Sequence, residues 1–97
     1  GDFKMPMLQS DNWMEWKSNM GTILSINGLA SYISSDTDAP MKAIVAEEKR
    51  IAQWQTGDAK ARTLIISAIS DPETIHLRGA KTARQMWEQL CKVKEHN

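Results

Sequence analysis

The sequence has little of what builds cross-linked or membrane-spanning proteins. Its 97 residues include a single cysteine, Cys91, so no disulfide can form within the chain. No apolar run approaches the ~18 residues of a membrane-spanning helix, and no signal-peptide core is visible near the start. Gly1 and Asp2, with no initiator Met before them, are interpreted as a remnant of cloning. These absences predict a cytoplasmic protein without a membrane partner.

Motifs for catalysis and metal binding are absent as well. Zinc sites need closely spaced Cys and His ligands, whereas this chain offers Cys91 and His96 at one end and a distant His76. Cys91 lies inside a helical apolar stripe, which favours a small buried residue over a nucleophile. Gly-rich phosphate loops, Gly-x-Ser-x-Gly and His-Glu-x-x-His do not occur. We therefore predict no catalytic residue, metal, cofactor or small-molecule substrate, and no enzyme.

An excess of one charge is also lacking. The 12 basic and 12 acidic side chains cancel to a formal net charge of zero, which leaves no overall field to attract nucleic acid. Basic residues do gather near the end of the chain. The candidates for weak nucleic-acid contact are Arg78, Lys81, Arg84, Lys92 and Lys94. Because Glu88 offsets part of this charge, a solvated helix face is the favoured interpretation.

Tryptophan is the residue that the sequence does have in quantity. There are four tryptophans, Trp13, Trp16, Trp54 and Trp87, but only one Phe and one Tyr. A tryptophan ring buries a large area and is costly to expose. We therefore expect the first and last long helices to meet through these rings. Trp13, in the first helical turn, is the ring that we expect to be partly exposed.

The N-terminal region divides into an arm and a helix. Pro6 excludes a helix interior, so residues 1–9 are predicted to be an extended arm and residues 10–97 a helical domain. Asn12, with Glu15 three residues later, resembles a capping box that starts a helix. The apolar stripe of this helix consists of Trp13, Trp16, Met20, Ile23 and Leu24. Asn27-Gly28 is a stop signal, and residues 29–33 are expected to form one further helical turn.

The middle of the chain is helical by its pattern, but its continuity is undecided. Asp38 and Pro40 resemble a helix start, and an apolar stripe continues to Ile69. Gly57 interrupts this pattern, and Asp58 resembles a new cap. Residues 41–69 are therefore predicted to form either one long helix or two helices that meet at Gly57.

The last third of the chain contains two further start signals. Ser70-Asp71-Pro72-Glu73 predicts a short helix that ends near Gly79, and Thr82-Ala83-Arg84-Gln85 predicts the final helix. The stripe of the final helix is Ala83, Met86, Trp87, Leu90 and Val93. No strand alternation or hairpin signal appears. The predicted fold class is all-α: a small orthogonal bundle of four to six helices with an extended N-terminal arm.

The order and spacing of these apolar residues carry a family resemblance. Over residues 8–93 the chain resembles the N-terminal capsid part of Gag from copia-type LTR retrotransposons. Ser10 stands where that family usually has Gly, and Trp13 where it usually has Tyr. The residues that carry the resemblance, and that we expect to form the core, are Leu8, Trp13, Trp16, Met20, Trp54, Ala61, Ile65, Ile69, Ala83, Trp87 and Leu90.

The resemblance implies a structural, self-associating module. Gag copies pack through helical capsid domains into a shell around the element's RNA, so the implied partners are further copies of the chain and the C-terminal capsid lobe. RNA contact is implied only through regions absent here, because one cysteine cannot form a zinc knuckle. The resemblance also covers host genes derived from Gag. The alternatives are therefore a domesticated Gag-derived adaptor and a weak nucleic-acid-binding helical module.

Overall fold

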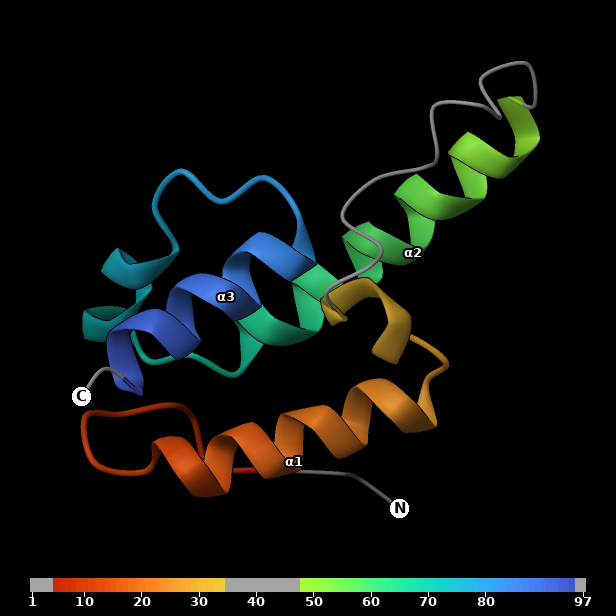
Figure 1. Ribbon diagram of the computed structural model, residues 1–97. Coiled ribbons are helices and arrows are strands. Elements are labelled where there is room, and N and C mark those ends of the chain that lie inside the picture. The colour runs from red at the N-terminus through yellow and green to blue at the C-terminus, as the bar shows by residue number, and fades with distance from the viewer. Residues whose placement is uncertain (1–4, 35–47, 96–97) are drawn as a thin grey trace.

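The computed structural model describes residues 5–34 and 48–95, and side chains from residue 51 in the second range. In these residues the chain forms α1 (Trp13–Ile26), the 3-10 helix η1 (Ala30–Ile33), α2 (Glu48–Ser67), the 3-10 helix η3 (Asp71–Leu77) and α3 (Ala83–Lys94). The predicted all-α class is confirmed. Figure 1 shows α1 lying along α3 and the C-terminal end of α2, while the first turns of α2 project away from them. The predicted helix start at Asp38 and Pro40 lies outside the described residues.

The segment before α1 is held by main-chain hydrogen bonds to the end of α2. The N–H of Leu8 donates to the carbonyl of Ala68 at 2.7 Å, and the carbonyl of Leu8 accepts from the N–H of Ser70 at 3.2 Å. An isolated parallel bridge joins Leu8 to Ile69. The Leu8 side chain is fully buried. Residues near the start of the chain therefore contribute to the core.

Two predicted side-chain caps are wrong. Asn12 precedes α1 but makes no cap hydrogen bond; its Oδ1 accepts from the N–H of Gln9 and its Nδ2 donates to the carbonyl of Met7. Ser70 precedes η3, yet its hydroxyl donates to the carbonyl of Leu8 at 2.6 Å. Both side chains hold the N-terminal segment, since they bond main-chain groups of residues 7–9.

The predicted end of α1 and start of α3 are confirmed. Gly28 follows α1 with φ +71°, in the left-handed region that glycine adopts without strain. At the start of α3 the hydroxyl of Thr82 accepts from the N–H of Gln85. The Gln85 side chain accepts in turn from the N–H of Lys81, one residue before the cap. These two hydrogen bonds fix the direction of α3 at its start.

The described part of the middle region is one uninterrupted helix. α2 runs through Gly57 without a break, so its C-terminal part does not start a second helix there. A Cβ at this position would overlap the hydroxyl end of Tyr32, whose ring also packs against Trp54 with centroids 5.9 Å apart. Glycine is present because it lets η1 approach α2, although it costs helix stability.

The core lies where α1, the C-terminal half of α2 and α3 meet. It includes every predicted core residue except Trp54 and Trp87, which are half-buried. Val93 belongs to the predicted stripe of α3 but is 41% exposed, so that part of the prediction is wrong. The buried apolar residues are Leu8, Trp13, Trp16, Met20, Leu24, Leu29, Ala61, Ile65, Ala68, Ile69, Ala83, Met86 and Leu90.

Candidate interaction surface

Three tryptophan rings join the first and last helices, as predicted. Trp13 and Trp16 stack with ring centroids 5.8 Å apart, and Trp87 of α3 lies 6.3 and 6.1 Å from them. The buried indole N–H of Trp16 donates to the carbonyl of Ala68 at 2.8 Å, which ties α1 to the end of α2. The Trp13 indole donates to Glu95 at 2.8 Å. This cluster is a structural junction, and Trp87 is its half-buried outer member.

A polar network borders the tryptophan rings. Lys17 pairs with Glu95 at 2.5 Å, and its ammonium lies 5.8 Å from the centroid of the Trp13 ring. Hydrogen bonds from Lys17 and Trp13 hold the pKa of the Glu95 carboxyl below its ordinary value. The hydrogen bond to Glu95 raises the pKa of the Lys17 ammonium. Burial raises the pKa of the neighbouring Cys91 thiol above its ordinary value, which disfavours the thiolate form.

A second ion pair ties η3 to α3. Lys94 contacts the carboxylate of Glu73, and both side chains are largely buried. The imidazole Nε2 of His76 lies 3.5 Å from the same carboxylate oxygen. The amide of Gln89 donates to the main-chain carbonyls of His76 and Arg78 at 2.8 and 3.1 Å. These contacts place η3 on the last turns of α3 and determine which face of η3 remains exposed.

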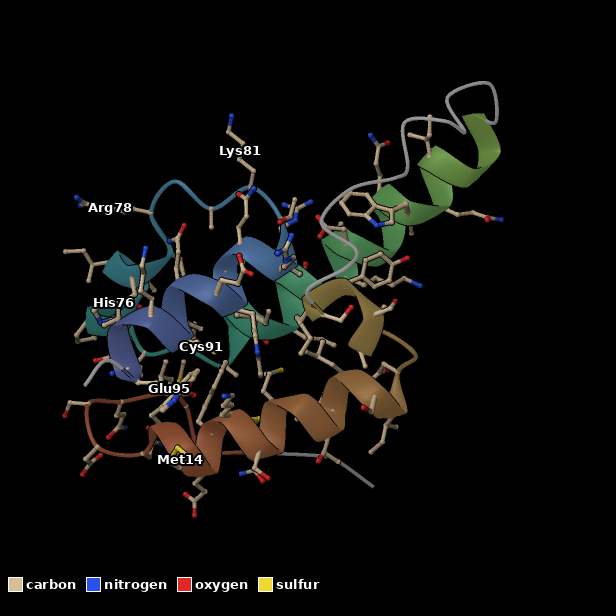
Figure 2. The ribbon with its side chains drawn as sticks, in the orientation of Figure 1. Met14, His76, Arg78, Lys81, Cys91 and Glu95 are labelled. Carbon is tan, nitrogen blue, oxygen red and sulfur yellow. The ribbon has the colours of Figure 1, made fainter. Side chains whose placement is uncertain are left out.

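Two of the five candidate nucleic-acid residues are engaged in ion pairs, and three are exposed. Lys94 is in the pair with Glu73, and Arg84 pairs with Glu88 at 3.1 Å. Arg78 and Lys81 project into solvent from the loop between η3 and α3, as Figure 2 shows. Lys92 is exposed in the last turn of α3. Lys92 lies on the face of α3 that carries Gln85 and Gln89. The side chains of these two glutamines contact the main chain of Lys81, His76 and Arg78.

A contact of Asp58 shows a connection that the sequence did not reveal. Its buried carboxylate accepts from the main-chain N–H of Ala83, the first residue of α3, at 2.9 Å. The other carboxylate oxygen accepts from Nε of Arg62 at 2.8 Å. Asp58 therefore caps α3 from the side of α2, whereas its local context suggested a cap for its own helix. Asp58 does cap a helix, as the sequence Gly57-Asp58 suggested, but that helix is α3, which is distant in sequence.

The outer face of α1 carries exposed apolar side chains at both ends. Met14 is 72% and Ile26 is 69% exposed, and the stripe between them has the small residues Ser18, Gly21 and Ser25. These residues line a shallow groove, together with Lys17, Thr22 and Trp87. We call this surface the α1 face. Exposed large apolar side chains around small ones leave room for another element to approach closely.

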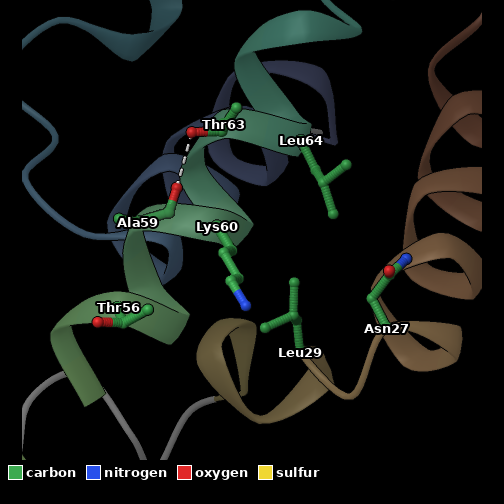
Figure 3. Close-up of a pocket in the computed structure, with 7 residues that line it drawn as sticks. All are labelled: Asn27, Leu29, Thr56, Ala59, Lys60, Thr63 and Leu64. Atoms are coloured by element: carbon green, nitrogen blue, oxygen red, sulfur yellow. Dashed lines mark hydrogen bonds between the residues drawn. The ribbon is translucent and has the colours of Figure 1, made fainter. Parts of the chain in front are cut away.

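A second groove lies between the end of α1, η1 and α2. Its lining residues, shown in Figure 3, are Asn27, Leu29, Thr56, Ala59, Lys60, Thr63 and Leu64. The volume of this groove is about 570 Å³. Leucines supply its apolar surface, threonines supply hydroxyls, and Lys60 supplies its one charge. We call this surface the η1–α2 groove.

Comparison with known proteins identifies the family. Residues 20–96 match the gag-polypeptide family of LTR copia-type elements. The chain belongs to this family. No curated protein and no solved structure matches it. The family resemblance seen in the sequence is therefore confirmed, and the matched part of this Gag domain extends from the second half of α1 to the end of α3.

Within the Gag domain, the residues that carry the family resemblance differ in how deeply they are buried. Trp13 is only 7% exposed, so the expectation that it would be partly exposed is wrong. It is shielded because Trp16, Trp87 and the Lys17–Glu95 pair surround its ring. The half-buried rings are Trp87 and Trp54, the latter beside η1 rather than in the main core.

The described part of the Gag domain holds no cluster of three or more His, Cys, Asp or Glu side chains able to bind a metal ion. In the same residues no helix is long and apolar enough to cross a membrane. The exposed surfaces of the described residues include the α1 face, the η1–α2 groove and the outer side of η3.

Proposed function

We propose that the chain is a structural, non-enzymatic Gag module that associates with further copies of itself in a capsid-type shell around retrotransposon RNA, in the cytoplasm. Its other partner in the shell is the C-terminal capsid lobe. RNA is contacted through parts of Gag outside this chain, and neither a membrane nor a small molecule is a partner. Membership of the Gag family, together with the exposed apolar α1 face, supports this proposal.

The α1 face is the surface through which we expect copies to meet. Met14 and Ile26 are the two most exposed large apolar side chains among the described residues. Between them Ser18, Gly21 and Ser25 carry little bulk, so a second helix can approach the α1 backbone closely. Individual contacts of this kind are weak, and many copies acting together make a shell stable.

Sedimentation velocity over a wide concentration range tests the proposal. Met14→Asp should reduce self-association without unfolding the domain, because the side chain is exposed. Ile66→Asp is the matched control, since Ile66 is also an exposed aliphatic side chain on a helix, and it should leave association unchanged. A chain that is monomeric at every concentration, alone and within the full-length protein, would contradict self-association. Equal effects of the two substitutions would contradict the assignment to the α1 face.

The two alternatives receive less support from the structure. A nucleic-acid module is disfavoured because Arg84 and Lys94 are engaged in ion pairs, which leaves Arg78, Lys81 and Lys92 as exposed cations among the candidates. RNA titration at two salt concentrations tests it, because phosphate contacts produce a steep salt dependence. An adaptor that binds through exposed tryptophan is also disfavoured, since all four rings are buried or half-buried.

A further inference from the structure

The η1–α2 groove contains a cation that pairs with no acidic side chain in the described part of the chain. Lys60 makes no ion pair with any described residue, whereas Arg62, one turn away on the same helix, pairs with Asp58. Figure 3 shows the Lys60 side chain extending into the space between α2 and η1, next to Leu29. A groove with leucines on its walls and one uncompensated positive charge is complementary to a segment that carries an apolar side chain and a carboxylate.

The exposed side of η3 has this chemistry. In a 3-10 helix side chains three residues apart lie one above the other. Glu73 and His76 form the inward column, which is fixed to α3 through Lys94. Of the other two columns, Pro72 lies above Ile75 and Asp71 lies above Thr74, and these four residues are exposed. Leu77, at the end of the Asp71 column, packs against the core. Ile75 is 55% exposed although it is a large aliphatic residue.

We propose that the exposed side of η3 of one copy docks in the η1–α2 groove of another copy, with Asp71 beside Lys60 and Ile75 against Leu29 and Leu64. This inference rests on the proposed function, because it supplies a contact between copies. The two surfaces that form this contact are separate from the α1 face.

The placement of the two surfaces makes the contact heterologous. Figure 1 shows η3 and the η1–α2 region at different ends of the domain, so one copy cannot satisfy its own groove. A contact that joins different patches of identical molecules continues from copy to copy, and it forms rings when the rotation closes. Contacts that continue in this way can join many copies into one assembly. The second copy is therefore the occupant that fits both the charge and the geometry.

Charge reversal tests the pairing. Lys60→Glu and Asp71→Lys should each lower the association constant, by about five- to tenfold, because each places like charges together. Combining both substitutions in one chain, or mixing the two single variants, should restore association. Lys92→Glu is the matched control, an exposed lysine outside the groove, and should change nothing. If the combined variant associates as weakly as the single variants, the pairing is wrong.

Cysteine cross-linking provides a measurement that detects weak contacts. In a Cys91→Ser background, the combination of Lys60→Cys with Asp71→Cys should give a ladder of disulfide-linked oligomers on oxidation, as a heterologous contact requires. Lys92→Cys with Asp71→Cys should give far less. The absence of a ladder would overturn the proposal. If the wild type associates and Met14→Asp weakens it, but neither charge reversal nor cross-linking has an effect, this contact fails while the proposed function stands. If the wild type never associates, both fail.

Discussion

The cap that Asp58 provides for α3 leads to a sharp prediction about stability. Its carboxylate joins the buried N–H of Ala83 to the guanidinium of Arg62, so removal affects one tertiary and one local contact. Asp58→Ala loses a hydrogen bond to a charged group, worth about 1.5–3 kcal/mol, and leaves the Ala83 N–H without its partner. The lost charge at a helix N-terminus adds about 0.3–1 kcal/mol. We therefore expect the free energy of unfolding to fall by about 2–4 kcal/mol.

Two further substitutions separate the contributions of Asp58. Asp58→Asn keeps an oxygen that accepts from Ala83 but removes the charge, so it should cost about 1–2 kcal/mol. Arg62→Ala removes only the i,i+4 ion pair, whose arginine is 37% exposed, and should cost no more than about 0.5 kcal/mol. The expected order of destabilisation is thus Asp58→Ala, then Asp58→Asn, then Arg62→Ala.

Urea unfolding followed by far-UV circular dichroism measures these differences, with an unchanged m value as the check that the denatured state is unaffected. For a domain of this size each kcal/mol lowers the melting temperature by about 4–8 °C, so Asp58→Ala should be visible by heating as well. The reasoning is refuted if Asp58→Ala costs no more than Arg62→Ala. That result would mean that the carboxylate contributes only a surface ion pair, and that α3 begins without help from α2.

Three other predictions concern the tryptophan junction and α2. Trp16→Phe should cost about 1–3 kcal/mol in urea unfolding, because a buried carbonyl loses its indole donor, and Trp16→Ala about 3–5 kcal/mol. The pKa of Glu95 is lowered in the folded state, so its contribution to stability is present above its unfolded pKa and is lost as the pH falls through the folded pKa. Glu95→Gln should abolish this acid-side dependence in melting curves. Gly57→Ala should destabilise the domain by displacing Tyr32, but in a Tyr32→Ala background it should stabilise it by up to about 1 kcal/mol.

Local start and stop signals for helices in the sequence predicted much of the fold. The stop at Asn27-Gly28 and the box at Thr82 and Gln85 act within a few residues, where the chain supplies both partners. Apolar periodicity placed Trp16 and Leu90 correctly on buried faces because a helix that meets one neighbour has a single buried stripe. Such signals need no knowledge of what lies elsewhere in the chain.

The failures occurred where a side chain had a choice of partners. Asn12 and Ser70 are typical cap residues, but their side chains form hydrogen bonds with main-chain groups of the neighbouring arm instead of capping a helix. Gly57 resembles a helix break until the position of Tyr32 is known. Asp58 acts on a helix far along the chain. Periodicity also cannot tell how much of a stripe its neighbours cover, which is why Val93 was included in the apolar stripe of α3 although it is exposed.

The grooves that carry the proposals were not predictable from the sequence for the same reason. Leu29 precedes η1 and Leu64 lies in α2, and neither pattern shows that Lys60 would lie between them without an ionic partner among the described residues. The 3-10 form of η3 decides which of its side chains face outward. A helix of α geometry would have turned Ile75 relative to Glu73 by a different angle.

The boundary of the family match falls within the α1 face. The match begins at Met20, in the middle of α1, yet Leu8 and Trp16 are fully or almost fully buried and bond to the end of α2. The folding unit therefore starts before the matched part, since losing these residues would uncover the core. Met14 of the α1 face also lies before the match, whereas the groove and η3 lie within it. The two proposed contacts use different residues, so they must be tested by separate substitutions.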